Sequence, residues 1–264
     1  MALERDILDH YDEGREQRRL TAAPSLELLR TQVILRRHLP APPARILDVG
    51  GGAGVHAAWL ADDGYRVHLV DPVPLHLEQA AEHGGFTTAL GDARALPEDD
   101  GTVDATLLLG PLYHLTEGAD RLLALQEARR VTNRGGLVAA AAISRYASTF
   151  DGYFRGFLDE PGFEPLVRAD LATGQHRNPT AHPRFFTTAY FHRAEELAAE
   201  LTSAGLTDVE VLPVEGPLFW APGIQDRLAD PTQRELILEV LETMEQDPAL
   251  RAATAHLLAI GRVA

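Results

Sequence analysis

Short apolar runs alternate with longer helical stretches through the first 143 residues of this 264-residue chain. The runs are rich in Val, Leu and Ile and are bounded by Gly, Pro or Asp, which predicts strands that are covered on both faces. They are residues 45–49, 66–70, 86–90, 104–109 and 137–143, with helices predicted at 55–63, 75–83 and 117–131. This alternation is typical of parallel strands joined by crossover helices. We therefore expect an α/β fold with a Rossmann-like sheet and helices on both faces.

The remainder of the chain divides around that sheet. Helices are predicted at 25–39, 193–204 and 235–245, and strands at 208–212 and 255–263. Residues 144–190 contain many Gly, Pro, aromatic, Arg and His residues without a clear period, so we interpret them as an insertion. The expected organisation is an N-terminal arm over residues 1–24 and one domain over 25–264, with cap insertions at about 144–190 and 213–254.

Composition excludes several classes of chemistry. The formal charge of −15 disfavours binding to a phosphate backbone, so no nucleic acid partner is expected. All 24 basic residues are Arg, which removes lysine-anchored cofactors, and the absence of Cys removes thiolate nucleophiles and Cys-ligated zinc. No two of the eleven His are spaced with carboxylates as in a zinc peptidase, so no metal is predicted. No apolar run of about 18 residues exists and the N-terminus is too charged for a signal peptide, so we expect a cytoplasmic protein without a membrane partner.

A glycine-rich turn follows directly on the first predicted strand and leads into a helix. It reads Asp48-Val49-Gly50-Gly51-Gly52-Ala53-Gly54. Glycines at alternate positions let the backbone turn sharply and approach a ligand that a side chain would exclude. The turn is therefore a candidate cofactor loop.

Acidic residues follow the next two strands along the chain. Asp71 ends the second strand, where it can accept hydrogen bonds from both ribose hydroxyls of an adenosine. Asp92 follows the third strand and can reach the exocyclic amine of an adenine, with the backbone of Ala93 at another ring position. Because these strands are parallel, the three acidic sites are expected at one edge of the sheet.

At these residues the sequence resembles the class I S-adenosylmethionine-dependent methyltransferases, over residues 44–143 and the closing strands. The glycine motif of that family matches Asp48, Gly50, Gly52 and Gly54; a dinucleotide motif fits less well, because Val55 stands where its third glycine belongs. The resemblance implies a seven-stranded, mostly parallel sheet whose last strand is antiparallel. It also implies S-adenosyl-L-methionine as cofactor, with S-adenosyl-L-homocysteine as product. The implied cofactor-binding residues are Tyr11, Arg19, Asp48, Gly50, Gly51, Gly52, Gly54, Asp71, Pro72, Asp92, Ala93, Arg94, Leu109 and Gly110.

The end of the fourth strand is where the methyl group and its acceptor should meet. Gly110-Pro111-Leu112-Tyr113 differs from the Asn/Asp-Pro-Pro-Tyr loop of amino-methylating nucleic acid enzymes at its first and third positions. The loop is similar to that of bacterial small-molecule methyltransferases. We interpret His114 as the candidate catalytic base for a hydroxyl acceptor, the alternative being that it only orients the substrate. Tyr113 is expected to pack against the cofactor or the acceptor.

Two further segments carry candidate ligand contacts. The N-terminal arm has Tyr11 and Arg19, which would contact the cofactor, although a solvated charged helix accounts for the arm as well. In the insertion, aromatic and hydrogen-bonding residues indicate either a selective pocket or a cap with a small core of its own. The predicted substrate-binding residues are Tyr113, His114, Arg145, His176, Asn178, His182 and Phe186.

The expected function is methyl transfer to an O or N atom of a small molecule, with bacterial secondary metabolism as its candidate setting. Two alternatives stay open: a methyltransferase acting on protein or RNA, and a binding protein that holds the cofactor without turnover. The acceptor and the oligomeric state are not determined by the sequence.

Overall fold

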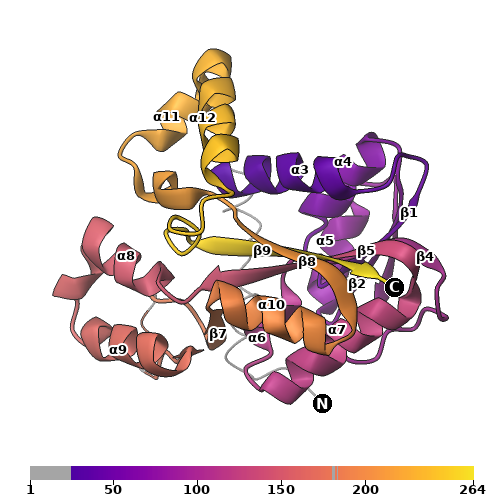
Figure 1. Ribbon diagram of the computed structural model, residues 1–264, viewed down its shortest axis with the longest axis horizontal. Coiled ribbons are helices and arrows are strands. Elements are labelled where there is room, and N and C mark those ends of the chain that lie inside the picture. Colours follow the sequence, from indigo (N-terminus) through magenta and orange to yellow (C-terminus); the bar gives the residue numbers. More distant parts are fainter. Residues whose placement is uncertain (1–24, 180–181, 183) are drawn as a thin grey trace. The chain divides into compact units, whose positions relative to one another are not determined.

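The computed structural model describes residues 25–179, 182 and 184–264 (Figure 1). Contacts group the chain into two compact units. We call residues 35–141, 197–210 and 259–264 the core unit, and residues 25–34, 142–196 and 211–258 the second unit, within the described part of the chain.

The core unit contains the predicted alternation of strands and helices. Helix α3 (Leu26–His38) leads into it, and each predicted strand and helix lies within a few residues of its expected position. The elements are β1 (Arg45–Val49), α4 (Val55–Asp62), β2 (Arg66–Asp71), α5 (Pro74–Ala81), β3 (Thr87–Leu90), β4 (Val103–Leu108), α6 (Pro111–His114), α7 (Gly118–Val131) and β5 (Thr132–Ser144).

Strands β1 to β5 are parallel and lie in the order β3-β2-β1-β4-β5. The apolar residues of β1, β2, β4 and β5 are mostly buried, as expected for strands covered on both faces, whereas the edge strand β3 exposes Leu90 (63%). From β1 the chain adds β2 and β3 on one side of the sheet, and then β4 and β5 on the other side of β1. In open α/β sheets, ligands bind at the carboxyl ends of the strands beside such a switch point. Asp48, Asp71 and Leu109 are located at or next to those carboxyl ends.

The insertion at residues 144–190 is more regular than its sequence pattern predicts. It contains α8 (Ala147–Phe154), a 3₁₀ turn (Phe157–Asp159), α9 (Phe163–Thr173), β6 (Gln175–His176) and the start of β7 (Ala189–His192). Helix α9 and the loop before β7 share a small cluster of buried residues: Phe163, Leu166, Val167 and Phe185. The cluster joins residues about 20 positions apart, which explains why no local period reveals it. The insertion thus has a small core of its own.

The closing elements are α10 (Ala194–Ser203), β8 (Leu206–Pro213), a 3₁₀ turn (Gly216–Trp220), α11 (Ile224–Ala229), α12 (Pro231–Met244) and β9 (His256–Val263). Strand β9 pairs with β5 and β8, and the arrows of β8 and β9 point in opposite directions, which confirms the antiparallel last strand (Figure 1). The two short strands β6 and β7 were not predicted, so the described sheet has nine strands instead of seven. Within the described residues, no helix is long and apolar enough to cross a membrane.

Candidate functional site

The turn after β1 is held by close packing against the turn after β4. Gly50 has a φ of +66°, and its amide donates a hydrogen bond to the Val70 carbonyl at 2.7 Å. A Cβ added at Gly50 would lie 2.6 Å from Cγ of Pro111, in the first turn of α6. Glycine is therefore required at position 50 for the two turns to touch.

Gly52 is the point at which the glycine turn is open. Its φ is +56°, and a Cβ placed there would have no heavy atom within 4 Å, in contrast to Gly50, Gly51 and Gly54, whose added Cβ atoms would collide with neighbouring atoms. Gly54 precedes α4, so the turn leads directly into the amino end of that helix. The arrangement leaves space at Gly52 for the close approach of a ligand to the backbone.

Asp71 fixes the glycine turn to the end of β2. Its side chain is almost fully buried and accepts hydrogen bonds from the amides of Gly52 and Val73, both at 2.9 Å. Nδ1 of His76, in the first turn of α5, is hydrogen-bonded to the same carboxylate at 3.0 Å. The sequence interpretation missed His76, although its position five residues after Asp71 is a signal that could have been used. Neighbouring Pro72 is exposed.

Asp48 lies beneath the turn and is completely buried. Neither of its carboxylate oxygens has a hydrogen-bond partner among the described residues. Burial, followed by the charge of Asp71, raises the pKa of Asp48 to about 7. A buried carboxylate without a donor is stabilised in its charged form by a cation, so Asp48 is suited to a positively charged ligand group.

Asp92 follows β3 and is paired with Arg94. The amide, Nε and Nη2 of Arg94 all donate to the Asp92 carboxylate, and Nη1 donates to Asp120 at 2.9 Å. Burial of Asp92 opposes its ionisation, but the hydrogen bonds and charge of Arg94 outweigh that effect and keep the pKa of Asp92 below its usual range. Ala93 between them is buried. The guanidinium of Arg94 therefore positions Asp92, whose side chain remains 37% exposed.

The segment after β4 brings Leu109, Gly110 and α6 to the same edge. A Cβ on Gly110 would lie 3.1 Å from the Gly50 carbonyl oxygen and 3.6 Å from the Tyr113 hydroxyl. The rings of Tyr113 and His114 meet edge to face, with centroids 4.6 Å apart, and both side chains are half-buried. The predicted catalytic residues therefore lie in the core unit, on the helix that packs against the glycine turn.

Of the predicted substrate residues in the second unit, Arg145 and His176 are buried. Arg145 donates to the Phe191 carbonyl at 2.7 Å and to Glu196 at 2.6 Å, which gives it a structural role there. His176 is hydrogen-bonded through Nδ1 to Asp170 at 2.9 Å and stacks on Phe191, with centroids 4.6 Å apart. The sequence interpretation did not include Asp170.

The other three lie around one loop of the second unit. Asn178 donates through Nδ2 to the His182 carbonyl at 3.0 Å and accepts from the His182 amide at 2.9 Å. The His182 ring stacks on Phe185, and Phe186 has its ring centroid 6.3 Å from that of His176. Tyr11 and Arg19, predicted in the arm, lie outside the described residues.

Comparison with known proteins agrees with this geometry. A family model described as a methyltransferase domain matches residues 46–136. The chain is similar to a malonyl-[acyl-carrier protein] O-methyltransferase of Geobacter sulfurreducens, at 34% identity over 64% of this chain and 58% of that protein. It is also similar to a ubiquinone biosynthesis O-methyltransferase of Methylocella silvestris, at 34% identity over 43% and 46% of the two chains. The chain thus spans about half the length of the curated relatives it matches.

Solved structures show the same fold. A S-adenosylmethionine-dependent methyltransferase of Thermotoga maritima, described as a possible histamine N-methyltransferase, aligns with a TM-score of 0.61 at 17% identity, over 98% of this chain and 99% of that one. The phosphoethanolamine N-methyltransferase 2 of Haemonchus contortus, solved with S-adenosyl-L-methionine, aligns with a TM-score of 0.56 at 16% identity, over 89% and 52%.

Proposed function

Since the chain belongs to the class I S-adenosylmethionine-dependent methyltransferases, we propose that it transfers the methyl group of S-adenosylmethionine to an oxygen or nitrogen atom of a small molecule. The observation that carries the proposal is the arrangement at the sheet edge where the turns after β1 and β4 meet. There an open backbone position, Gly52, and a buried carboxylate, Asp48, lie in the same unit as His114.

The residues at this edge fit the cofactor. The bare Gly52 backbone gives a ligand room, and the partnerless carboxylate of Asp48 is complementary to the positive charge of S-adenosylmethionine. Bound there, the cofactor would supply a methyl group already activated by its sulfonium. We assign Asp71 to the ribose hydroxyls and Asp92, with Ala93, to the adenine; Pro72, Arg94, Leu109 and Gly110 would complete the site.

The chain's main contribution is to position the acceptor and to keep water away. We assign this role to α6, where the packed rings of Tyr113 and His114 follow the turn that touches Gly50. For a hydroxyl acceptor, His114 takes the proton; for an amine acceptor that is already neutral, positioning alone suffices.

In the second unit, we assign acceptor contacts to the loop of Asn178 and His182 and to Phe186. His176, which is hydrogen-bonded to Asp170, completes this set. Arg145 would act by fixing β7, since its guanidinium is bonded to Phe191 and Glu196. Tyr11 and Arg19 of the arm remain proposed cofactor contacts.

Two observations support a small acceptor. A curated relative is named for O-methylation in ubiquinone biosynthesis, and the chain's charge of −15 disfavours RNA. We place the reaction in bacterial secondary metabolism.

The test is transfer of a labelled methyl group. Purified protein is incubated with methyl-labelled S-adenosylmethionine and bacterial extract, and the products are separated by mass. Label in low-mass products is expected; label in protein or RNA would favour the macromolecular alternative, and cofactor binding without transfer would favour the binding protein.

A matched pair of variants ties the result to the open position at Gly52. Gly52→Val fills the open position and should abolish transfer and cofactor binding. Gly84→Val is the control, because Gly84 also has positive φ, +70°, and open space around an added Cβ, but lies in the turn after α5. Equal activity of the two variants would contradict the proposed cofactor site.

A further inference from the structure

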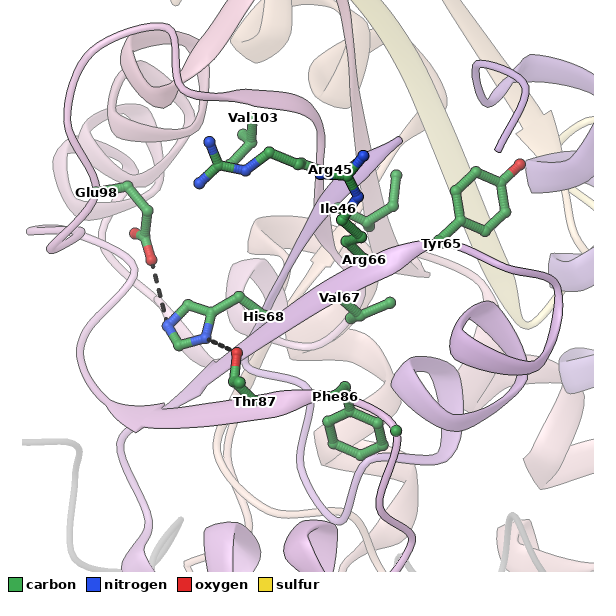
Figure 2. Close-up of a pocket in the computed structure, with 11 residues that line it drawn as sticks. Arg45, Ile46, Tyr65, Arg66, Val67, His68, Phe86, Thr87, Glu98 and Val103 are labelled. Atoms are coloured by element: carbon green, nitrogen blue, oxygen red, sulfur yellow. Dashed lines mark hydrogen bonds and ion pairs between the residues drawn. The ribbon is translucent and has the colours of Figure 1, made fainter. Parts of the chain in front are cut away.

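A hollow of about 690 Å³ borders the amino ends of strands β1 to β4 (Figure 2). Its lining includes Arg45, Arg66, His68, Phe86, Thr87 and Glu98, all in the core unit. The proposed cofactor site lies at the carboxyl ends of these same strands, so the hollow is on the opposite edge of the sheet. The proposed function does not use it.

The strand register places the polar lining residues on one face of the sheet. Arg45 is the register partner of Arg66 on β2, and His68 is the register partner of Thr87 on β3. Register partners on adjacent strands point to the same face, and residues two apart along a strand do so as well. Arg45, Arg66, His68 and Thr87 therefore project together.

Arg45 and Arg66 place two positive charges on directly paired residues. Among the described residues, neither guanidinium has a hydrogen bond or an ion pair. Asp104 accepts from the Arg45 backbone amide at 2.8 Å and from Asn133 at 2.7 Å, not from the guanidinium. Like charges on directly paired residues repel each other, and a bound anion of two charges removes that repulsion.

The other side of the hollow offers hydrogen-bond acceptors. His68 hydrogen-bonds Thr87 at 2.7 Å and lies 3.5 Å from Oε1 of Glu98, as the dashed lines in Figure 2 show. The second oxygen, Oε2, is buried and has no hydrogen-bond partner among the residues that the structure describes. Such an atom needs a donor, which a ligand with an amine can supply.

We propose that this hollow binds a small molecule carrying a phosphate group. Arg45 and Arg66, on directly paired positions of β1 and β2, hold the phosphate, because guanidiniums match the charge and the oxygen geometry of a dianion. Oε2 of Glu98 accepts a hydrogen bond from the rest of the ligand. The volume lies within the range of small-molecule sites in proteins.

The test is calorimetric titration of the full chain with two probes, inorganic pyrophosphate and cytidine 5′-monophosphate. Excess S-adenosylhomocysteine is present throughout, so that the proposed cofactor site is occupied. Both probes are expected to bind once per chain, and the Arg45→Ala/Arg66→Ala double variant should weaken both affinities at least tenfold. Raising the salt concentration should weaken binding as well, because the contact is ionic.

The matched control is Arg227→Ala/Arg234→Ala, which removes the same charge from α11 and α12 of the second unit. It should change the affinities less than twofold, and both double variants should keep the melting temperature of the wild type. Glu98→Gln should raise the affinity for pyrophosphate at least twofold, because it removes a negative charge from the hollow. Absence of binding, or equal affinities in the two double variants, would overturn the proposal and leave the methyltransferase assignment untouched.

Discussion

The carboxylate of Asp71 accepts a hydrogen bond from the amide of Gly52 at 2.9 Å, which ties the end of β2 to the open position of the glycine turn. The same side chain is bonded to the Val73 amide and to His76. One acidic residue thus sets the shape of the candidate cofactor site and also lies where the ribose is expected.

Asp71→Ala should therefore weaken binding and destabilise the fold together. We expect a loss of about 1–3 kcal/mol in cofactor affinity, from charge-assisted hydrogen bonds. Calorimetry with S-adenosylhomocysteine measures the affinity, and thermal unfolding measures the stability. An unchanged affinity would contradict the ribose assignment; His76→Ala, which spares the carboxylate, should have the smaller effect.

The buried carboxylate of Asp48 makes stability depend on pH. Its pKa is raised from 3.8 to about 7, so between these values the folded chain keeps a proton that the unfolded chain has released. Stability should then fall as the pH rises from about 4 to about 7 and should level off above that. Asp48→Asn should remove this component, on the order of a few kcal/mol. Urea unfolding of both proteins at about pH 5 and about pH 8 checks it; equal pH dependence would count against the raised pKa.

Ligand binding should show the opposite pH dependence at the same residue. Ionised Asp48 attracts a cation, so the affinity for S-adenosylhomocysteine, which carries an ammonium group, should rise through about pH 7 in the wild type. In Asp48→Asn the affinity should be weaker at about pH 8 and nearly independent of pH across this range. A parallel rise in the variant would assign the titration to another group.

His114→Ala should slow turnover while leaving cofactor affinity unchanged. A positioned general base contributes roughly 10²–10⁴-fold, and a residue that only orients the acceptor contributes less. Steady-state kinetics across pH separates the two roles, because loss of a base also removes the acidic limb of the profile. The exposed His83→Ala is the control, and wild-type rates in His114→Ala would reduce His114 to a scaffold.

Arg30 and Glu245 form a buried ion pair in the second unit, with Nη2 and Oε2 2.5 Å apart and side chains 0% and 3% exposed. Arg30→Ala leaves a buried carboxylate without its cation, so we expect the free energy of unfolding to fall by about 3–5 kcal/mol. Chemical unfolding measures it. The exposed Arg36–Asp63 pair is the control, where Arg36→Ala should cost about 1 kcal/mol or less. Similar decreases in the free energy of unfolding in the two variants would show that burial of the ion pair does not determine the size of the destabilisation.

The core of the fold was predictable because its signals are local. Strand β1 was predicted to the residue, and the glycine turn and the acidic residue ending β2 follow from short motifs. The structure of the insertion was not predictable, because its core joins Phe163 to Phe185, which are far apart in the sequence. Its strands β6 and β7 are also only two and four residues long.

In the candidate site as well, features set by local motifs were predictable and features set by side-chain packing were not. The positions of Asp48, Asp71 and Asp92 at neighbouring strand ends followed from the parallel order of the strands. Side-chain packing, which no motif specifies, determines the other features of the site. These are the hydrogen bond from the Gly52 amide to Asp71, the pairing of Asp92 with Arg94 and the burial of Asp48. The hollow at the opposite edge depends on the register of Arg45 with Arg66, and register is fixed only when the sheet forms.

The close approach of Gly50 to Pro111 limits which residues position 50 can accept. Because the proline ring occupies the volume that a side chain at position 50 would need, any larger residue there would push the turns after β1 and β4 apart. Libraries intended to broaden acceptor range should therefore keep glycine at position 50.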